Sequence, residues 1–373
     1  MKCMPASFLS LIVASLLVTP ALADVTIGVA AGMTGPDAAF GEQIRHGVEM
    51  AVADINAAGG MNGERLSNEV ADDVDDPKQA VTVANRFVGD QVKFVVGHVA
   101  SSASIPASEV YAEHGILEVS PSSTNVKYTD RGLWNTFRSC GRDDQQAVIA
   151  AHYILKTFPK ARIAILHDKT VGGEGLALAF KKLINAAGLT NRLFTGINPG
   201  EKDISAIITR MKAEQVDIVY YGGFYTDAGL ILRQAGDQGY KVKLMAADGI
   251  ATSDFPSVAG PNVEGTLMTF GPDPRRNPKA SGIVQEFRAA GFEPESYTLY
   301  AYAGVQIIAA GANATKSNDP KVIAEWLHAG HTVETVLGPI VFDKKGDRTD
   351  SGYIVYEWRR SAEGKLSYEP VEN

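Results

Sequence analysis

Short apolar segments alternate with longer amphipathic segments along almost the whole chain. The first apolar segment, Val25–Ala30, is followed by Gly41–Asn56, in which Ile44, Val48 and Ile55 recur at the spacing of one helix face. The apolar segments are rich in β-branched residues and do not alternate with polar ones, which is typical of parallel sheets covered on both faces. The pattern therefore predicts strands joined by crossover helices. It recurs at 93–97 with 101–114, at 115–120, at 162–168 with 174–187, at 217–222 with 227–238, and at 243–247.

This series falls into two parts, one before and one after about residue 140. The segment Ser139–Asp144 between them is polar, as expected of a connection that crosses from one lobe to another. We therefore predict an α/β fold made of two doubly wound parallel-sheet lobes rather than one very large sheet.

Residues 1–23 have the parts of a secretory signal peptide. Lys2 precedes the apolar run Phe8–Val18, and Ala21–Ala23 supplies the small residues that signal peptidase accepts. The alternative, an N-terminal membrane anchor, is disfavoured because the run is shorter than the about 20 apolar residues that span a bilayer. Cleavage after Ala23 would leave Cys140 as the one remaining cysteine, so we predict an exported protein with no internal disulfide and no membrane insertion.

The composition narrows the class of protein further. Of the 373 residues, 45% are hydrophobic and 21% are charged, which excludes a disordered or fibrous chain. The formal net charge is −8. An acidic balance argues against a protein that binds nucleic acid through phosphate contacts.

Polar residues that follow the predicted strands are the candidates for a binding site, because open parallel sheets bind ligands beyond the carboxyl ends of their strands. Ser101 begins a predicted helix and suits an anion, or it is a plain N-cap. Ser122 and Thr124 offer a carbonyl and a hydroxyl to an ammonium group, or they belong to a turn at Pro121. Asp248 would pair with a cation, or it opens an Asp-Gly turn. Together they describe a receptor for a zwitterion.

Two other stretches carry expectations of their own. In the aromatic stretch 220–225, Tyr220 and Tyr221 are predicted to lie in the core, whereas Phe224 and Tyr225 are placed to wall a cleft. The acidic stretch Asp72–Asp76 lacks the glycine and the distal glutamate of a calcium loop, so we interpret it as a solvated loop.

Motifs of catalysis are largely missing from the sequence. It contains no G-x-S-x-G elbow, no P-loop, no H-E-x-x-H and no C-x-x-C. An exported hydrolase would use Ser101 with His98 or His167, but no spacing supplies a third group to orient the base. We therefore predict no catalytic residues, no cofactor and no metal.

Several stretches in order along the mature chain match one known family. They are 41–60 (ending AVADINAAGG), 75–80 (DDPKQA), 95–102 (VVGHVASS), 165–175 (ILHDKTVGGEG), 200–203 (GEKD), 219–223 (VYYGG), 231–235 (ILRQA) and 336–339 (VLGP). With them the chain resembles the periplasmic leucine/isoleucine/valine-binding proteins, the receptors of branched-chain amino-acid ABC transporters. The resemblance implies a type I periplasmic binding protein with three crossings between its lobes. Lobe 1 would comprise 24–142 plus 271–350, and lobe 2 would comprise 143–270 plus 351–373.

The same resemblance implies roles for individual residues. Ser101 and Thr124 would hold the α-carboxylate of the ligand. The ammonium group would be held by the Ser122 carbonyl, the Thr124 hydroxyl and Asp248. The walls of the side-chain pocket would be Phe40, Val99, Gly172 and Phe224.

The sequence departs from the family pattern at several of these positions. Branched-chain receptors of the family typically have tyrosine where Phe40, Gly172 and Phe224 stand, and glutamate where Asp248 stands. A cysteine pair common in the family falls on Asp75 and Ala100, so that disulfide is absent. Losing a ring at Gly172 and a methylene at Asp248 would enlarge the cavity.

The expected function is the periplasmic substrate-binding component of an amino-acid ABC transporter, in a Gram-negative cell. It would bind a zwitterionic amino acid, branched-chain by family, and deliver it as a monomer to a membrane permease. A second candidate function keeps the scaffold and binds an aromatic amino acid or a γ-aminobutyrate-like zwitterion. The exported hydrolase and a receptor associated with a sensor are less favoured by the sequence.

Overall fold

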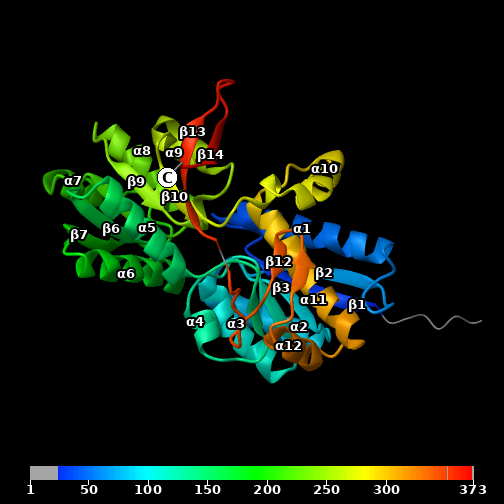
Figure 1. The fold of residues 1–373 in the computed structure, drawn as a ribbon. Helices are drawn as coiled ribbons and strands as arrows, with labels where there is room; N and C mark the ends of the chain where they lie inside the picture. Colours follow the sequence, from blue (N-terminus) through cyan, green and yellow to red (C-terminus); the bar gives the residue numbers. More distant parts are fainter. Residues whose placement is uncertain (1–23, 351, 372–373) are drawn as a thin grey trace, which may run out of the picture.

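The structure is a computed structural model that describes residues 24–350 and 352–371, so the predicted signal peptide lies outside the described residues. Its strands form two large sheets, each in its own lobe (Figure 1). The first sheet has the order β2-β1-β3-β4-β5 and is parallel throughout. Its strands are β1 Val25–Ala31, β2 Leu66–Asp72, β3 Phe94–Gly97, β4 Leu117–Ser120 and β5 Thr136–Arg138.

The second sheet has the order β14-β13-β10-β9-β8-β6-β7. Its strands are β6 Ile163–His167, β7 Leu193–Gly196, β8 Ile218–Gly222, β9 Lys243–Ala246, β10 Leu267–Phe270, β13 Ile354–Arg360 and β14 Leu366–Pro370. The predicted doubly wound α/β architecture is confirmed for both lobes. The edge formed by β13 and β14 is antiparallel, unlike the prediction, because a short turn joins these two strands and forces them to run in opposite directions.

Helices cover both faces of the first sheet, as its continuous apolar strands require. Phe94 and Val96 point into the same core cluster as Ile44 of α1, whereas Val95 between them packs with Ala103 of α3. The helices of this lobe are α1 Ala38–Ala57, α2 Pro77–Gly89, α3 Ser101–Glu113, α4 Lys127–Asp130, α10 Ser281–Ala289, α11 Ser296–Thr315 and α12 Pro320–His328. A small sheet of β11 Val333–Thr335 and β12 Gly338–Ile340 lies near α11.

The second lobe repeats this arrangement. Tyr220 of β8 stacks on Phe180 with ring centroids 3.8 Å apart, while Tyr221 belongs to the core on the other face of the sheet. Both tyrosines are fully buried, so their predicted place in the core is confirmed. The helices are α5 Asp143–Thr157, α6 Val171–Ala186, α7 Ser205–Ala213, α8 Tyr225–Asp237 and α9 Phe255–Ala259. The short 3-10 helices of this lobe are η1 Asp248–Ile250 and η2 Gly260–Val263, whereas η3 Pro274–Arg276 and η4 Pro278–Ala280 follow the crossing after β10 and contact α10 and α11 of the first lobe.

The described chain passes between the lobes after β5, after β10 and after β12, and Figure 1 shows the C-terminal hairpin returning to the second lobe. The lobe boundaries inferred from the family resemblance, at 142/143, 270/271 and 350/351, stay a prediction. Cys140, in the first crossing, is buried and free.

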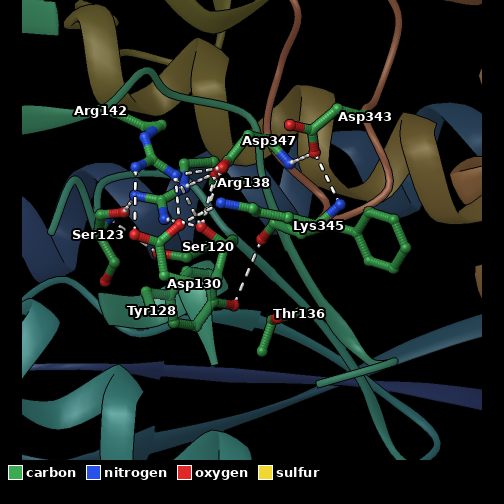
Figure 2. Close-up of polar contacts among 12 residues, drawn as sticks. Ser120, Ser123, Tyr128, Asp130, Thr136, Arg138, Arg142, Asp343, Lys345 and Asp347 are labelled. Carbon is green, nitrogen blue, oxygen red and sulfur yellow. Dashed lines mark hydrogen bonds and ion pairs between the residues drawn. The ribbon is translucent and has the colours of Figure 1, made fainter. Parts of the chain in front are cut away.

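A buried ion-pair network lies beside the first and third crossings (Figure 2). Arg138 forms an ion pair with Asp347, with 2.7 Å between Nε and Oδ1. Arg142 forms a second ion pair with the same carboxylate, with 2.5 Å between Nη1 and Oδ2. The Thr129 hydroxyl also donates to Asp347 at 2.9 Å. These contacts tie the segment before β13 to the segment that leaves β5.

In both sheets the strand order reverses at one point, between β1 and β3 in the first and between β6 and β8 in the second. Loops leaving such a pair of strands diverge to opposite faces and open a crevice. The two crevices face each other, and the candidate site lies between them.

Candidate ligand-binding site

A cavity lies between the two lobes at the carboxyl ends of strands from both sheets. It contains about 540 Å³ of empty space, part of it open to solvent. The structure brings all eight predicted site residues together as lining of this one cavity: Phe40, Val99, Ser101, Ser122, Thr124, Gly172, Phe224 and Asp248. Their contact with a ligand stays a prediction.

Ser101 opens α3 but does not cap it. The N-cap is Ala100, which has an extended backbone, and no side chain caps this helix. The Ser101 hydroxyl instead accepts a hydrogen bond from the Asn125 N–H at 3.1 Å. The interpretation of Ser101 as an N-cap is therefore wrong. The first N–H groups of α3, which have no acceptor within the helix, are left with the positive end of the helix dipole and suit a carboxylate.

The buried Arg138 holds the loop that carries Ser122 and Thr124 through hydrogen bonds to its backbone. The guanidinium of Arg138 donates to the Ser123 carbonyl at 2.6 Å (Figure 2). It also donates to the Asn125 carbonyl at 3.1 Å. A second contact joins this loop to the segment after β3, because the Ser122 hydroxyl donates to the Val99 carbonyl at 3.0 Å. The loop is thus more than a turn after a strand, because a buried cation fixes its backbone.

Asp248 lies on the opposite side of the cavity, at the start of η1 directly after β9. The Tyr297 hydroxyl donates to its Oδ2 at 2.7 Å, and the Gln146 side chain donates to its Oδ1 at 3.1 Å. Burial raises the pKa of this carboxyl above its ordinary value, and both hydrogen bonds partly offset that effect. Tyr297 comes from the first lobe, and nothing in the sequence connects a residue 49 positions away with Asp248.

A second buried carboxyl, Asp143, lines the same cavity and was not among the predicted site residues. Its Oδ2 is buried and accepts no hydrogen bond from any described residue. Burial raises its pKa to about 7, and the neighbouring charge of Asp248 acts in the same direction. The sequence could have predicted this residue, because Asp143 belongs to the polar segment Ser139–Asp144 and a segment that connects two lobes passes beside the cleft between them. No lysine or arginine is among the described residues that line the cavity.

The apolar side of the cavity is built around Phe40. Its ring lies 5.7 Å from that of Phe224, which comes from the other lobe, and 5.6 Å from that of Tyr297. Tyr225, predicted to wall the cleft with Phe224, lies between the lobes with its ring 5.7 Å from that of Phe40, but it does not line this cavity. It is the first residue of α8, and its hydroxyl donates to the Pro36 carbonyl at 2.9 Å instead of facing the cavity.

The residues of the hydrolase hypothesis do not meet. His98 is fully buried, with one ring nitrogen bonded to Asp73 and the other 3.0 Å from the Tyr111 hydroxyl. His167 accepts the Lys169 N–H at 3.1 Å. Because Asp73 is fully buried in this pair, the interpretation of Asp72–Asp76 as a solvated loop is wrong for its second residue. Within residues 24–350 and 352–371, no group of side chains has the arrangement of a metal site.

Comparison with known proteins agrees with this architecture. The sequence profile of the periplasmic binding protein family matches residues 24–365. The Leu/Ile/Val-binding protein homolog 1 of Brucella suis is 52% identical over 348 residues, which are 93% of this chain and 94% of that protein. The chain belongs to the periplasmic binding protein family. The resemblance to leucine/isoleucine/valine-binding proteins predicted from the sequence is confirmed.

Solved structures of family members have the same fold. A leucine-binding protein from Thermotoga maritima superimposes with a TM-score of 0.85 at 25% identity, covering 94% of this chain and 99% of that one. An ABC transporter substrate-binding protein from Desulfitobacterium hafniense in complex with Leu gives a TM-score of 0.75 at 27% identity, covering 93% and 100%. In the present protein, none of the helices within the described residues is both long and apolar enough to cross a bilayer.

Proposed function

We propose that this protein is the periplasmic substrate-binding component of an amino-acid ABC transporter. It binds a zwitterionic amino acid between its lobes, with leucine, isoleucine and valine as the first candidates. One observation carries the proposal. A helix N-terminus with hydroxyls in one lobe faces the buried carboxylate of Asp248 in the other, across an interlobe cavity. The names of its relatives, which include Leu/Ile/Val-binding proteins, support the same class of ligand.

The two charged ends of the ligand have separate partners. The N–H groups of α3 with the hydroxyls of Ser101 and Thr124 hold the carboxylate. The ammonium group is held by Asp248 and by the carbonyl of Ser122, whose hydroxyl is engaged within its own loop. The unpartnered Oδ2 of Asp143 gives the ammonium a further acceptor. A bound cation would also stabilise the ionised forms of both buried carboxyls.

The ligand side chain lies against Phe40, Val99 and Phe224. An apolar wall separates side chains that differ by one methylene by only about 1–3 kcal/mol, so the wall selects a class rather than a single amino acid. Gly172 favours a wider class of ligand. A Cβ built there has its nearest neighbours at 3.7 Å, so this wall is open. An aromatic amino acid or a γ-aminobutyrate-like zwitterion is the second candidate ligand.

Binding is coupled to closure of the lobes, and the closed form is what a membrane permease reads. Hydrogen bonds already join the lobes in this structure. The Asn125 side chain donates to the Val171 carbonyl at 2.9 Å, and Tyr225 donates to Pro36 at 2.9 Å. The protein works as a monomer without catalysis, in the periplasm after loss of residues 1–23.

The test is calorimetric titration of the mature protein, freed of ligand by unfolding and refolding, with amino acids and γ-aminobutyrate. Asp248→Asn should weaken binding of the best ligand by about 10- to 100-fold, because a hydrogen bond to a charged group is worth about 1.5–3 kcal/mol. Glu214→Gln, which removes an exposed charge outside the described cavities, should leave affinity unchanged.

The titration separates the candidate ligands. A response to leucine, isoleucine and valine supports the branched-chain assignment, and a response to aromatic or longer zwitterions alone supports the second candidate. Absence of binding for every zwitterion, or equal affinity of wild type and Asp248→Asn, contradicts the proposal. Turnover of an ester or amide by the purified protein would instead revive the hydrolase hypothesis.

A further inference from the structure

A second cavity, here called the outer cavity, adjoins the candidate site on the side of Phe224. It contains about 1380 Å³ of empty space, partly open to solvent. It shares Ala100, Asp168, Thr170 and Phe224 with the candidate site as common walls. None of the residues proposed to hold the zwitterion, Ser101, Ser122, Thr124 and Asp248, lines it. The two cavities therefore follow one another, from the charged ends of the ligand to the aromatic wall and beyond.

Four carboxyls from both lobes line the outer cavity. Asp37 and Asp75 belong to the first lobe, and Asp168 and Asp227 belong to the second. Within the described residues none of these four forms an ion pair, and the donors that reach three of them are neutral. The Thr226 hydroxyl donates to Asp37 at 3.1 Å, the Thr170 hydroxyl to Asp168 at 2.7 Å, and the Tyr221 hydroxyl to Asp227 at 3.1 Å.

Two buried polar atoms in the same wall have no hydrogen-bond partner among the described residues. They are Oδ1 of Asp75 and the hydroxyl of Ser102. Part of Asp75 reaches the surface, but its Oδ1 is buried. A buried carboxylate oxygen without a donor costs free energy unless something binds it. Asp75 belongs to the acidic cluster itself, whereas the Ser102 hydroxyl is a separate polar atom of the same wall that is left open to a ligand.

The pKa values of the four carboxyls are all raised, as expected where negative charges lie close together away from water. Burial raises the pKa of Asp37 to about 7 and that of Asp168 to about 6, and the charges of the other carboxyls add to the effect. The pKa of Asp75 is raised well above its usual value by burial and by Asp73 and Asp37. Burial also raises the pKa of Asp227.

The other charged residues of the outer cavity lie at its rim. They are Lys202 and Arg233, which are exposed, and Glu201, which is half-buried. Across residues 24–350 and 352–371, no ion pair joins Lys202 or Arg233 to the four carboxyls. The cluster therefore holds a surplus of negative charge that protons or a bound cation must balance.

We propose that the outer cavity is a subsite for the terminal ammonium or guanidinium of a basic amino acid whose α-carboxylate and α-ammonium occupy the candidate site. This inference rests on the proposed function and extends its ligand class to lysine- and arginine-like side chains. The apolar stem of such a side chain lies along Phe40 and Phe224, and its charged end enters the outer cavity, whose walls carry the four carboxyls, a division that suits a long cationic chain. An organic cation fits better than a metal, because the described side chains offer no metal site.

The experiment compares L-lysine with L-norleucine, which has the same carbon chain and no terminal charge. Both are titrated into the refolded mature protein and into Asp37→Asn/Asp75→Asn, with Glu214→Gln as the control for loss of one charge. We expect wild type to bind lysine, and the double variant to lose at least about tenfold in lysine affinity but not in norleucine affinity. L-arginine should behave as lysine does.

A pH series gives a second readout. The α-groups of lysine and norleucine are alike, so titration of Asp143 and Asp248 cancels in the ratio of their affinities. The terminal ammonium of lysine stays charged from about pH 5 to about pH 8. Because Asp37 and Asp168 lose their protons over this range, the preference for lysine should rise with pH in wild type, and it should rise less steeply in the double variant, which keeps only Asp168 of these two.

The outcomes separate the two proposals. Binding of norleucine or leucine without binding of lysine or arginine overturns this inference and leaves the proposed function standing. Equal lysine affinity in wild type and a double variant with native thermal stability overturns it too. Absence of binding for every amino acid contradicts the proposed function, and this inference fails with it. Binding of 1,5-diaminopentane without lysine overturns the link between the outer cavity and the candidate site.

Discussion

Two adjacent glycines at the start of α6 show how differently neighbouring residues constrain the site. A Cβ on Gly172 would lie 3.7 Å from its nearest neighbours, an ordinary contact distance. A Cβ on Gly173 would lie 2.3 Å from Asp168 Oδ1 and 2.5 Å from the Gly222 carbonyl oxygen. At Gly173 the backbone of α6 packs directly on the end of β8, and any side chain must separate them.

At the residue scale we predict that Gly172→Ala leaves the free energy of unfolding unchanged or raises it by up to about 1 kcal/mol, because Ala restricts the unfolded chain. Gly173→Ala should lower it by about 1–3 kcal/mol, because the added methyl overpacks a backbone contact. Urea unfolding of the ligand-free variants measures both. Equal stability of the two variants would show that α6 moves freely away from β8.

The buried Arg138 connects two elements to the site. It ends β5, pairs with Asp347 before β13, and donates to the carbonyls of Ser123 and Asn125 in the loop that carries Thr124. The pair of Asp130 and Lys345 lies close by in the same network, 2.7 Å apart, but both side chains are exposed (Figure 2). The buried pair of Arg138 and Asp347 is therefore expected to contribute more to stability than the exposed pair of Asp130 and Lys345.

At the element scale we predict that Arg138→Met lowers the free energy of unfolding by about 3–5 kcal/mol, because it leaves the buried carbonyls of Ser123 and Asn125 without this donor and removes a buried charge paired with Asp347. Lys345→Ala, the control, should change the free energy of unfolding little, because its pair is exposed to solvent. Thermal and urea unfolding measure these losses. A loss for Arg138→Met no larger than that for Lys345→Ala would contradict the role given to the buried network.

The closure of the lobes that the proposed function requires would be linked to protons through Asp37. This carboxyl stands on the first lobe, beside the Thr226 hydroxyl and the charges of Asp227 and Asp168 on the second. Its pKa is raised to about 7 when the lobes are together, and separation of the lobes would return it to water and to its ordinary value. The closed form therefore binds a proton more tightly than an open form does.

At the scale of the molecule, a raised pKa in the closed form means that closure is favoured when Asp37 is protonated. That contribution is complete below about pH 4 and is lost as the pH rises through about 7. We predict that affinity for an uncharged side chain, relative to that of Asp37→Asn, falls about tenfold or more from about pH 5 to about pH 8. Calorimetric titration of both proteins across this range measures the ratio, in which the titration of Asp143 and Asp248 cancels. A constant ratio would disprove the linkage.

Local sequence pattern was enough to predict the strands β1, β3, β4, β6, β8 and β9 and the polar residues that follow them, but it did not predict β2, β5, β7 or β10. Apolar runs such as Val25–Ala30 and helix-spaced residues such as Ile44 and Val48 need no tertiary information, because each element buries its own periodic face. The rule that ligands bind beyond strand ends then nominated Ser101, Thr124 and Asp248, which line one cavity in the structure. Parallel strands all present their carboxyl ends at one edge, and this is why a local pattern could point to a shared site.

The surroundings of those residues depend on packing between distant parts of the chain. Tyr297 reaches Asp248 from a helix 49 positions away, Tyr225 turns to Pro36, and Asp73 is buried with His98. Such contacts form between lobes or between segments that are distant in the sequence, and the local pattern of apolar residues does not predict them. The acidic outer cavity has the same origin, because its carboxyls come from three loops and from the first turn of α8, which only the packed lobes bring together.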